Sequence, residues 1–186
     1  MKTEEELIWE SYTNCSCEDD LSYGCLMVYL DDDSANQIRQ FCKDTFNPEI
    51  LADYGIEDNP HVTCQYGFKD TVDVDDINSF INQNVKTPIN IKLGEISRFE
   101  NEQHDVIKVD VDSPDLHQLS DLIRNHFGDN LDISFPNYTP HLTLAYVKSG
   151  SLPHIDGDNM FNGKNHVFND FVYCDNNDEM YDIKKL

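Results

Sequence analysis

The sequence predicts a protein of two similar lobes, each combining strands with a helix, that meet at one site. The first observation is a tetrapeptide that occurs twice, 80 positions apart, as Pro60-His61-Val62-Thr63 and Pro140-His141-Leu142-Thr143. The second is that each copy opens a run of strand-forming residues, which indicates a buried strand. The third is that matching elements precede both copies at the same offset, as in an internal repeat.

In the first half, residues 25–30 are predicted to form a strand because all six are apolar or aromatic. A helix should follow, with Ser34 as its N-cap, because apolar residues recur there at helical spacing. Those apolar positions are Ile38, Phe41, Cys42 and Phe46. The first His-x-Thr strand, residues 62–66, comes next.

The second half repeats this order. Residues 106–111 alternate between apolar and polar side chains, which predicts a strand with Lys108 and Asp110 on its polar face. Ser113 then forms an N-cap, and Gly128 lies just past the end of the predicted helix. The apolar face of that helix contains Leu116, Leu119, Ile123 and Phe127. A pseudo-twofold relation between the lobes would bring the two His-x-Thr strands face to face.

Each motif places a histidine beside a threonine, since residues i and i+2 of a strand project to the same face. Two imidazoles suit in-line chemistry on a phosphodiester, because His61 and His141 can supply a base for the attacking oxygen and an acid for the leaving oxygen. The hydroxyls of Thr63 and Thr143 can donate to the phosphoryl oxygens. This chemistry requires no metal or cofactor, and the pattern does not determine which histidine is the acid.

Both motifs, together with residues 97–102, 106–117 and 138–147, resemble the 2H phosphoesterases, a family named for two His-x-Ser/Thr motifs. That family includes the 2′-5′ RNA ligase-like proteins and cyclic phosphodiesterases, and the segments look most like its phage-associated members. The resemblance extends from about Leu21 to the C-terminus. It implies a bilobal α+β fold with a pseudo-twofold axis, in which antiparallel sheets line a central cleft and helices lie outside.

The composition indicates a folded and strongly acidic protein. Hydrophobic residues make up 39% of the chain, and 36 Asp and Glu against 13 Lys and Arg give a formal net charge of −23. This charge repels polyanions, so we do not expect long RNA or DNA as a partner. A small nucleotide can still be held by a few local groups, because salt screens distant charges.

The chain is expected to contain an acidic extension over residues 1–20 and a single bilobal domain over residues 21–186. No apolar run approaches the roughly 20 residues of a membrane span, and the N-terminus lacks the pattern of a signal peptide. These features predict a cytoplasmic protein, of a cell or of an infected host, that makes no membrane contact. We expect a monomer.

Substrate contacts are expected from the motif strands and from segments beside them. Gln65 and Ala145 should line the floor of the cleft, whereas Tyr66 and Tyr146 should face the opposite side if the strands are regular. The candidates for stacking on a base are Tyr23, Tyr29, Phe99, His104 and Tyr138. The candidates for binding phosphate are Lys69, Arg98 and Lys148, because so few other residues are basic.

Three functions fit these observations. The first is a metal-independent phosphodiesterase that hydrolyses small cyclic nucleotides, and the phage-like resemblance favours a cyclic di- or oligonucleotide signal degraded to evade host immunity. The second is an RNA-end enzyme that acts on 2′,3′-cyclic or 2′-5′-linked termini. The third is a protein that sequesters a nucleotide without turnover, against which the two intact histidines argue.

Overall fold

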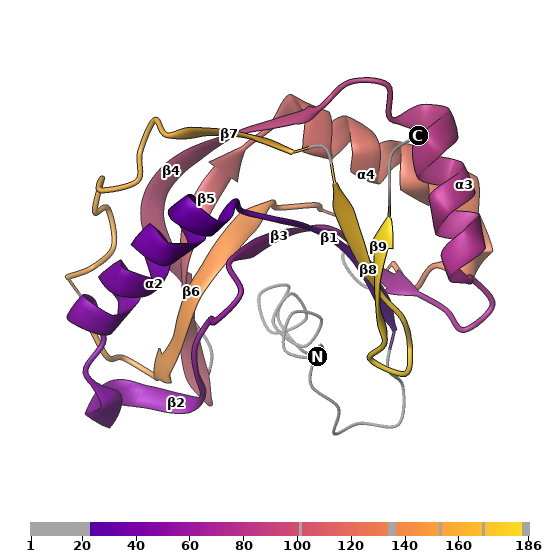
Figure 1. The fold of residues 1–186 in the computed structure, drawn as a ribbon. Coiled ribbons are helices and arrows are strands. Elements are labelled where there is room, and N and C mark those ends of the chain that lie inside the picture. Colours follow the sequence, from indigo (N-terminus) through magenta and orange to yellow (C-terminus); the bar gives the residue numbers. More distant parts are fainter. Residues whose placement is uncertain (1–22, 101, 134–136, 153, 169, 184–186) are drawn as a thin grey trace.

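The computed structural model describes residues 23–100, 102–133, 137–152, 154–168 and 170–183, so the predicted extension over residues 1–20 lies outside the described residues. The described strands form one nine-stranded antiparallel sheet that curves into an arch (Figure 1). The strands are β1 (Gly24–Tyr29), β2 (Leu51–Ile56), β3 (His61–Phe68), β4 (Ile89–Phe99), β5 (His104–Asp112), β6 (His141–Lys148), β7 (Asn165–Phe168), β8 (Phe171–Cys174) and β9 (Met180–Ile183).

The strand order has the symmetry that the repeat predicts. The strands follow one another as β7-β4-β5-β6-β3-β1-β8-β9, with β2 pairing with β6 outside this path. Reading outward from the centre, β3 corresponds to β6, β1 to β5, β8 to β4 and β9 to β7. The α+β fold with two pseudo-twofold halves is therefore confirmed, and the halves share one sheet because the two motif strands pair with each other.

Three α-helices accompany the strands, namely α2 (Asp32–Thr45), α3 (Val74–Asn84) and α4 (Pro114–Phe127), together with short 3₁₀ turns at Pro48–Ile50 and Gly128–Asn130. Ser113 caps α4 and Gly128 ends it, as predicted. The N-cap of α2 is Asp31 and not Ser34. The Asp31 carboxylate accepts the Ser34 N–H at 2.9 Å, so the helix begins inside the acidic run, where its dipole favours negative charge.

All three helices contribute to one core on one face of the sheet. The apolar faces of the helices pack there against alternate residues of the central strands, and α3 and α4 lie above the arch in Figure 1. The central members of this core are Ile38, Cys42, Val62, Cys64, Ile77, Leu116, Ile123, Leu142 and Leu144. We call the opposite face of the sheet, which carries His61, Thr63, His141 and Thr143, the site face.

A bulge in each motif strand changes which residues reach the site face. In β3, Gln65 pairs with Leu26 and Thr63 pairs with Met27, so Cys64 is an extra residue. In β6, Ala145 pairs with Ile107 and Thr143 pairs with Lys108, so one residue is again extra. An extra residue reverses the alternation of all side chains that follow. The residue three positions after each threonine is therefore on the site face.

The predicted orientation of the following residues is wrong for this reason. Gln65 and Ala145 lie on the helix side, where Ala145 is part of the core. Tyr66 packs on the site face against a small cluster of Cys25, Met27 and Cys174. Tyr146 lies on the same face in the other half. The prediction holds only for regular strands, and the bulges in β3 and β6 make these strands irregular.

Candidate active site

The two motifs meet at the centre of the sheet. Val62 of β3 pairs with Leu142 of β6 in antiparallel register, and both side chains are fully buried on the helix side. One step along each strand places His61 opposite Thr143, and one step in the other direction places Thr63 opposite His141. All four side chains project from the site face, because they alternate with Val62 and Leu142. The predicted convergence of two imidazoles and two hydroxyls is what the sheet produces.

Both imidazoles are oriented by the same local hydrogen bond. The Nδ1 of His61 lies 2.8 Å from the carbonyl oxygen of Asn59, and the Nδ1 of His141 lies 2.9 Å from the carbonyl oxygen of Thr139. A carbonyl oxygen only accepts, so in each ring Nδ1 carries the hydrogen and Nε2 is left as the reactive nitrogen. The proline between the two partners restricts the preceding residue to extended backbone, which favours this arrangement.

The two histidines differ in their surroundings. His141 is only 5% exposed, whereas His61 is half-buried. The pKa of His141 is lowered to about 4, chiefly by burial and also by the nearby charges of Lys108 and His61, while the bond to Thr139 and the charge of Asp110 act in the opposite direction. His141 is therefore neutral at neutral pH, with its hydrogen on Nδ1. A neutral imidazole of this kind can act as a general base.

Each imidazole also contacts an aromatic ring that the sequence predicted to lie near the site. The ring of Tyr29 lies 5.4 Å from that of His61, and the ring of Phe99 lies 5.0 Å from that of His141 in a perpendicular arrangement. Tyr29 is on β1 and Phe99 is at the end of β4, so each ring comes from the same half of the sheet as its histidine. These contacts limit the rotation of the two imidazoles.

Further aromatic groups lie on the site face beyond the motifs, one in each half. Tyr23 and Tyr66 meet edge to face at 5.9 Å in the first half. In the second half, Tyr146 lies 5.7 Å from His104 and 5.3 Å from Tyr54. Because β3 and β6 are antiparallel, these groups lie on opposite sides of the histidines. By the register of the partner strands, Tyr66 and Tyr146 each lie two residue steps from the threonine of their motif, which is about 7 Å at about 3.3 Å per residue.

A family profile and several solved structures match this chain. The sequence profile of the 2′-5′ RNA ligase superfamily matches residues 28–152, which is more than half of the chain. This chain belongs to that superfamily, the 2H phosphoesterases. No curated protein sequence matches the chain significantly.

Solved structures share the fold of this chain at low sequence identity. TT0787 of Thermus thermophilus superposes with a TM-score of 0.64 at 11% identity, over 88% of this chain and 98% of that one. E. coli LigT complexed with 3′-AMP gives 0.60 at 15% identity, over 81% and 84% of the two chains. Kluyveromyces marxianus Usb1 with uridine monophosphate gives 0.59 at 11% identity, over 87% and 97%.

Several residues predicted to contact the substrate make hydrogen bonds elsewhere in the structure. Arg98 is a structural residue, because its Nε donates to Asp156 at 2.7 Å and its Nη1 donates to Asp105 at 3.1 Å. Lys148 donates to the carbonyl of Glu49 at 2.7 Å at the far end of β6. Lys69 similarly donates to the carbonyl of Asp129 at 2.8 Å, just beyond the end of β3. None of these contacts involves a motif residue, and phosphate binding by the three cations stays a prediction.

Gln65 and Tyr138 also serve the framework. The Oε1 of Gln65 accepts from the hydroxyl of Ser120 at 3.0 Å and from Nε of Arg124 at 3.2 Å, which ties β3 to α4. The hydroxyl of Tyr138 donates to the carbonyl of Thr63 at 2.6 Å, and its ring packs edge to face with His117 of α4. Tyr138 thus stabilises the motif strand from the helix side, and it does not lie among the rings of the site face.

A polar group that the sequence did not reveal lies beside His141. By register, Lys108 lies opposite Thr143, and Asp110 lies opposite His141. The Nζ of Lys108 donates to Asp110 at 2.5 Å and to the hydroxyl of Ser97 at 2.6 Å. From the sequence, Lys108 and Asp110 are predicted only to form the polar face of a strand. One signal in the sequence does point to these two residues. Their strand directly precedes the second motif in the repeat, and in the structure the two strands pair.

Two further absences hold for the part of the chain that the structure describes. Within those ranges, no three His, Cys, Asp or Glu side chains lie together as a metal site would require. Among the same residues, no helix is long and apolar enough to cross a membrane.

Proposed function

We propose that this chain is a metal-independent phosphodiesterase that hydrolyses small cyclic nucleotides. The observation that carries the proposal is the paired arrangement of His61 and His141, each with Nδ1 bonded to a backbone carbonyl and each opposite the threonine of the other motif. Two such imidazoles supply both proton transfers of a phosphodiester hydrolysis.

In the proposed reaction, the Nε2 of His141 takes the proton from a water molecule as its oxygen attacks phosphorus. The opposite phosphorus–oxygen bond breaks, and the leaving oxygen receives a proton from Nε2 of the His61 imidazolium. The hydroxyls of Thr63 and Thr143 donate to the non-bridging oxygens, where negative charge increases. The lowered pKa of His141 is the reason for assigning it as the base.

We further propose a substrate with a nucleoside on each side of the cleaved phosphate, such as a cyclic di- or oligonucleotide. Its support is the placement of Tyr66 and Tyr146, with their aromatic neighbours, on opposite sides of the histidines. Aromatic rings stack on bases without sequence preference. The structures of LigT with 3′-AMP and of Usb1 with uridine monophosphate support nucleotide binding by this fold. The biological role we favour is removal of such a signal in an infected host.

The net charge supports a small substrate over a long one. A chain of formal charge −23 has few cations with which to release the counterions of a polymer. We expect kcat/KM for a cyclic dinucleotide to exceed that for an RNA of roughly 20 nucleotides with the same linkage by about tenfold at low salt. The difference in kcat/KM between the two substrates should become smaller as the salt concentration rises.

The test is turnover of a panel of linkages by the purified full-length protein with excess EDTA. The panel contains cyclic dinucleotides, cyclic trinucleotides, 2′,3′-cyclic mononucleotides and RNAs with 2′,3′-cyclic or 2′-5′-linked ends. Cleavage of the cyclic dinucleotides that survives EDTA and is lost in His141→Gln supports the proposal. Equal or better turnover of the long RNAs points to the RNA-end enzyme, and tight binding without product points to sequestration.

A further inference from the structure

The two halves of the site face differ in the residue that lies opposite each motif threonine. In the first half, Met27 of β1 lies opposite Thr63, and in the second half Lys108 of β5 lies opposite Thr143. The surroundings differ accordingly, because Met27 belongs to an apolar cluster with Cys25 and Cys174. The fold therefore accommodates an apolar side chain at this position. The presence of a lysine at the equivalent position in the second half needs a reason other than folding.

The position of Lys108 is unusual for a charged side chain. Its side chain is only 5% exposed, although an ammonium group loses favourable hydration when it is buried. Its Nζ lies 4.4 Å from the centre of the Phe99 ring, and Phe99 in turn contacts His141. Lys108 thus belongs to the same packed group as the proposed base, in a chain that has only 13 lysines and arginines.

Two neighbours hold the ammonium group in place. Asp110 accepts from Nζ at 2.5 Å and Ser97 accepts at 2.6 Å, while the Ser97 hydroxyl donates to Asp110 at 2.6 Å. The side chain of Asp110 is 53% exposed, so this carboxylate remains hydrated and its charge is partly screened. An ammonium group has three N–H donors, and these two acceptors use two of them.

We propose that Lys108 binds the substrate phosphate directly, donating from Nζ to a non-bridging oxygen on the Thr143 side, with Asp110 and Ser97 positioning it. This inference rests on the proposed function. It makes the pseudo-symmetric site directional, because one half has Lys108 opposite its threonine where the other half has the uncharged Met27. The phosphate charge would also offset the cost of burying the ammonium group.

The charged and titratable groups around His141 fit this assignment. Those that face it are His61 from β3 and Lys108 and Asp110 from β5, while β4 contributes the uncharged Phe99. Loss of the Lys108 charge should therefore raise the pKa of His141, since Asp110 would remain without its opposing cation. A lysine with a purely space-filling role would leave this pKa unchanged when replaced by methionine.

The decisive variant is Lys108→Met, which reproduces the residue found at the equivalent position in the first half. We expect it to weaken binding of 3′-AMP about 10- to 100-fold by calorimetry, the scale of a hydrogen bond to a charged group, and to lower kcat/KM by a similar factor. The acidic limb of the pH–kcat/KM profile should move to higher pH. Lys108→Arg, which retains the charge, should recover part of the lost affinity.

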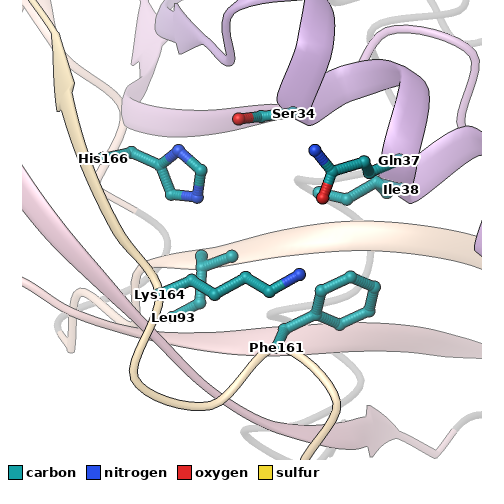
Figure 2. A pocket seen from close by; sticks show the side chains of 7 residues that line it. All are labelled: Ser34, Gln37, Ile38, Leu93, Phe161, Lys164 and His166. Atoms are coloured by element: carbon teal, nitrogen blue, oxygen red, sulfur yellow. The ribbon is translucent and has the colours of Figure 1, made fainter.

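The matched control is Lys164→Met. Lys164 also lies over a phenylalanine, with its Nζ 5.0 Å from the centre of the Phe161 ring. It borders a pocket on the helix side of the sheet, next to α2, as Figure 2 shows. The same substitution there should change neither 3′-AMP affinity nor kcat/KM.

Two outcomes would overturn the assignment of Lys108. One is wild-type affinity for 3′-AMP in a folded Lys108→Met protein, and the other is a wild-type protein that does not bind 3′-AMP at millimolar concentration. If Lys108→Met does not fold, the NMR signal of the Lys108 side chain in the wild-type protein must shift on addition of 3′-AMP, and an unmoved signal overturns the proposal. Binding through Lys108 without any turnover would instead reject the proposed hydrolysis and leave this inference standing.

Discussion

Val62 of β3 pairs with Leu142 of β6, and the two halves of the molecule are related about this pair. The pairing places each histidine opposite the threonine of the other motif. A substrate phosphate above the pair would contact groups from both halves at once. Substitution of the motif residues in either half should therefore impair the same reaction.

The histidines should act as one unit. We expect His61→Ala and His141→Ala each to lower kcat by at least about 10²-fold, the scale of a positioned acid or base. The double variant should be little worse than either single variant, because both residues act in one transition state. His117→Ala, on an exposed part of α4, is the control and should retain activity. Losses that multiply in the double variant would show that the two histidines act in separate steps.

The pH profile of kcat/KM should be bell-shaped, with its acidic limb set by His141. Because the pKa of His141 is lowered to about 4, the base remains unprotonated at pH 5 and activity should persist there. Activity should fall at high pH as the acid loses its proton. The test is to measure initial rates across the pH range in which circular dichroism shows that the protein is folded. An acidic limb near the ordinary histidine value of about 6.5 would contradict the assignment of His141 as the base.

The same histidine should make stability depend on pH. Its pKa is about 4 in the folded protein, below the value of about 6.5 expected when unfolded. Between these pH values the unfolded state binds more protons than the folded state. The contribution of His141 to the free energy of unfolding is therefore lost as pH falls from about 6.5 to 4. Urea unfolding of wild type and His141→Asn should show this loss, up to roughly 3 kcal/mol, in the wild type alone. Parallel curves for the two proteins would reject it.

The tyrosines exposed to the site face by the bulges should matter for dinucleotides. We expect Tyr66→Ala and Tyr146→Ala each to lower kcat/KM for a cyclic dinucleotide by about 5- to 150-fold, the range of one base stacked on an aromatic ring. A 2′,3′-cyclic mononucleotide should lose less in at least one of the two variants, since it occupies one side only. Tyr181→Ala on β9 is the control. Equal losses for both substrates in both variants would contradict the two-sided site.

Gln65 should affect stability and not chemistry. Replacement by leucine leaves Ser120 without its buried acceptor, which should lower the free energy of unfolding by about 1–3 kcal/mol. Well below the unfolding transition, kcat/KM should stay within about twofold of wild type. Chemical denaturation and initial rates check the two parts separately. A large loss of kcat/KM in the folded variant would return Gln65 to the site.

The sequence by itself determined the repeat, and with it the fold and the site. Two copies of Pro-His-x-Thr at a fixed offset, each preceded by a strand and a helix, required two equivalent halves. The periodicity of α4 and its capping residues Ser113 and Gly128 identified that helix correctly, because those signals are local. The placement of His61 beside Thr63, and of His141 beside Thr143, followed from strand alternation alone.

Only the tertiary structure decided what surrounds the motifs. A bulge depends on the pairing of neighbouring strands, so nothing local to residues 63–66 or 143–146 indicated that the tyrosines turn to the site face. The role of each cation likewise depended on partners distant in sequence: Asp156 engages Arg98, whereas the pairing of β5 with β6 brings Lys108 to Thr143. Charge and alternation are properties of the chain, but which acid meets which base is a property of the packed sheet.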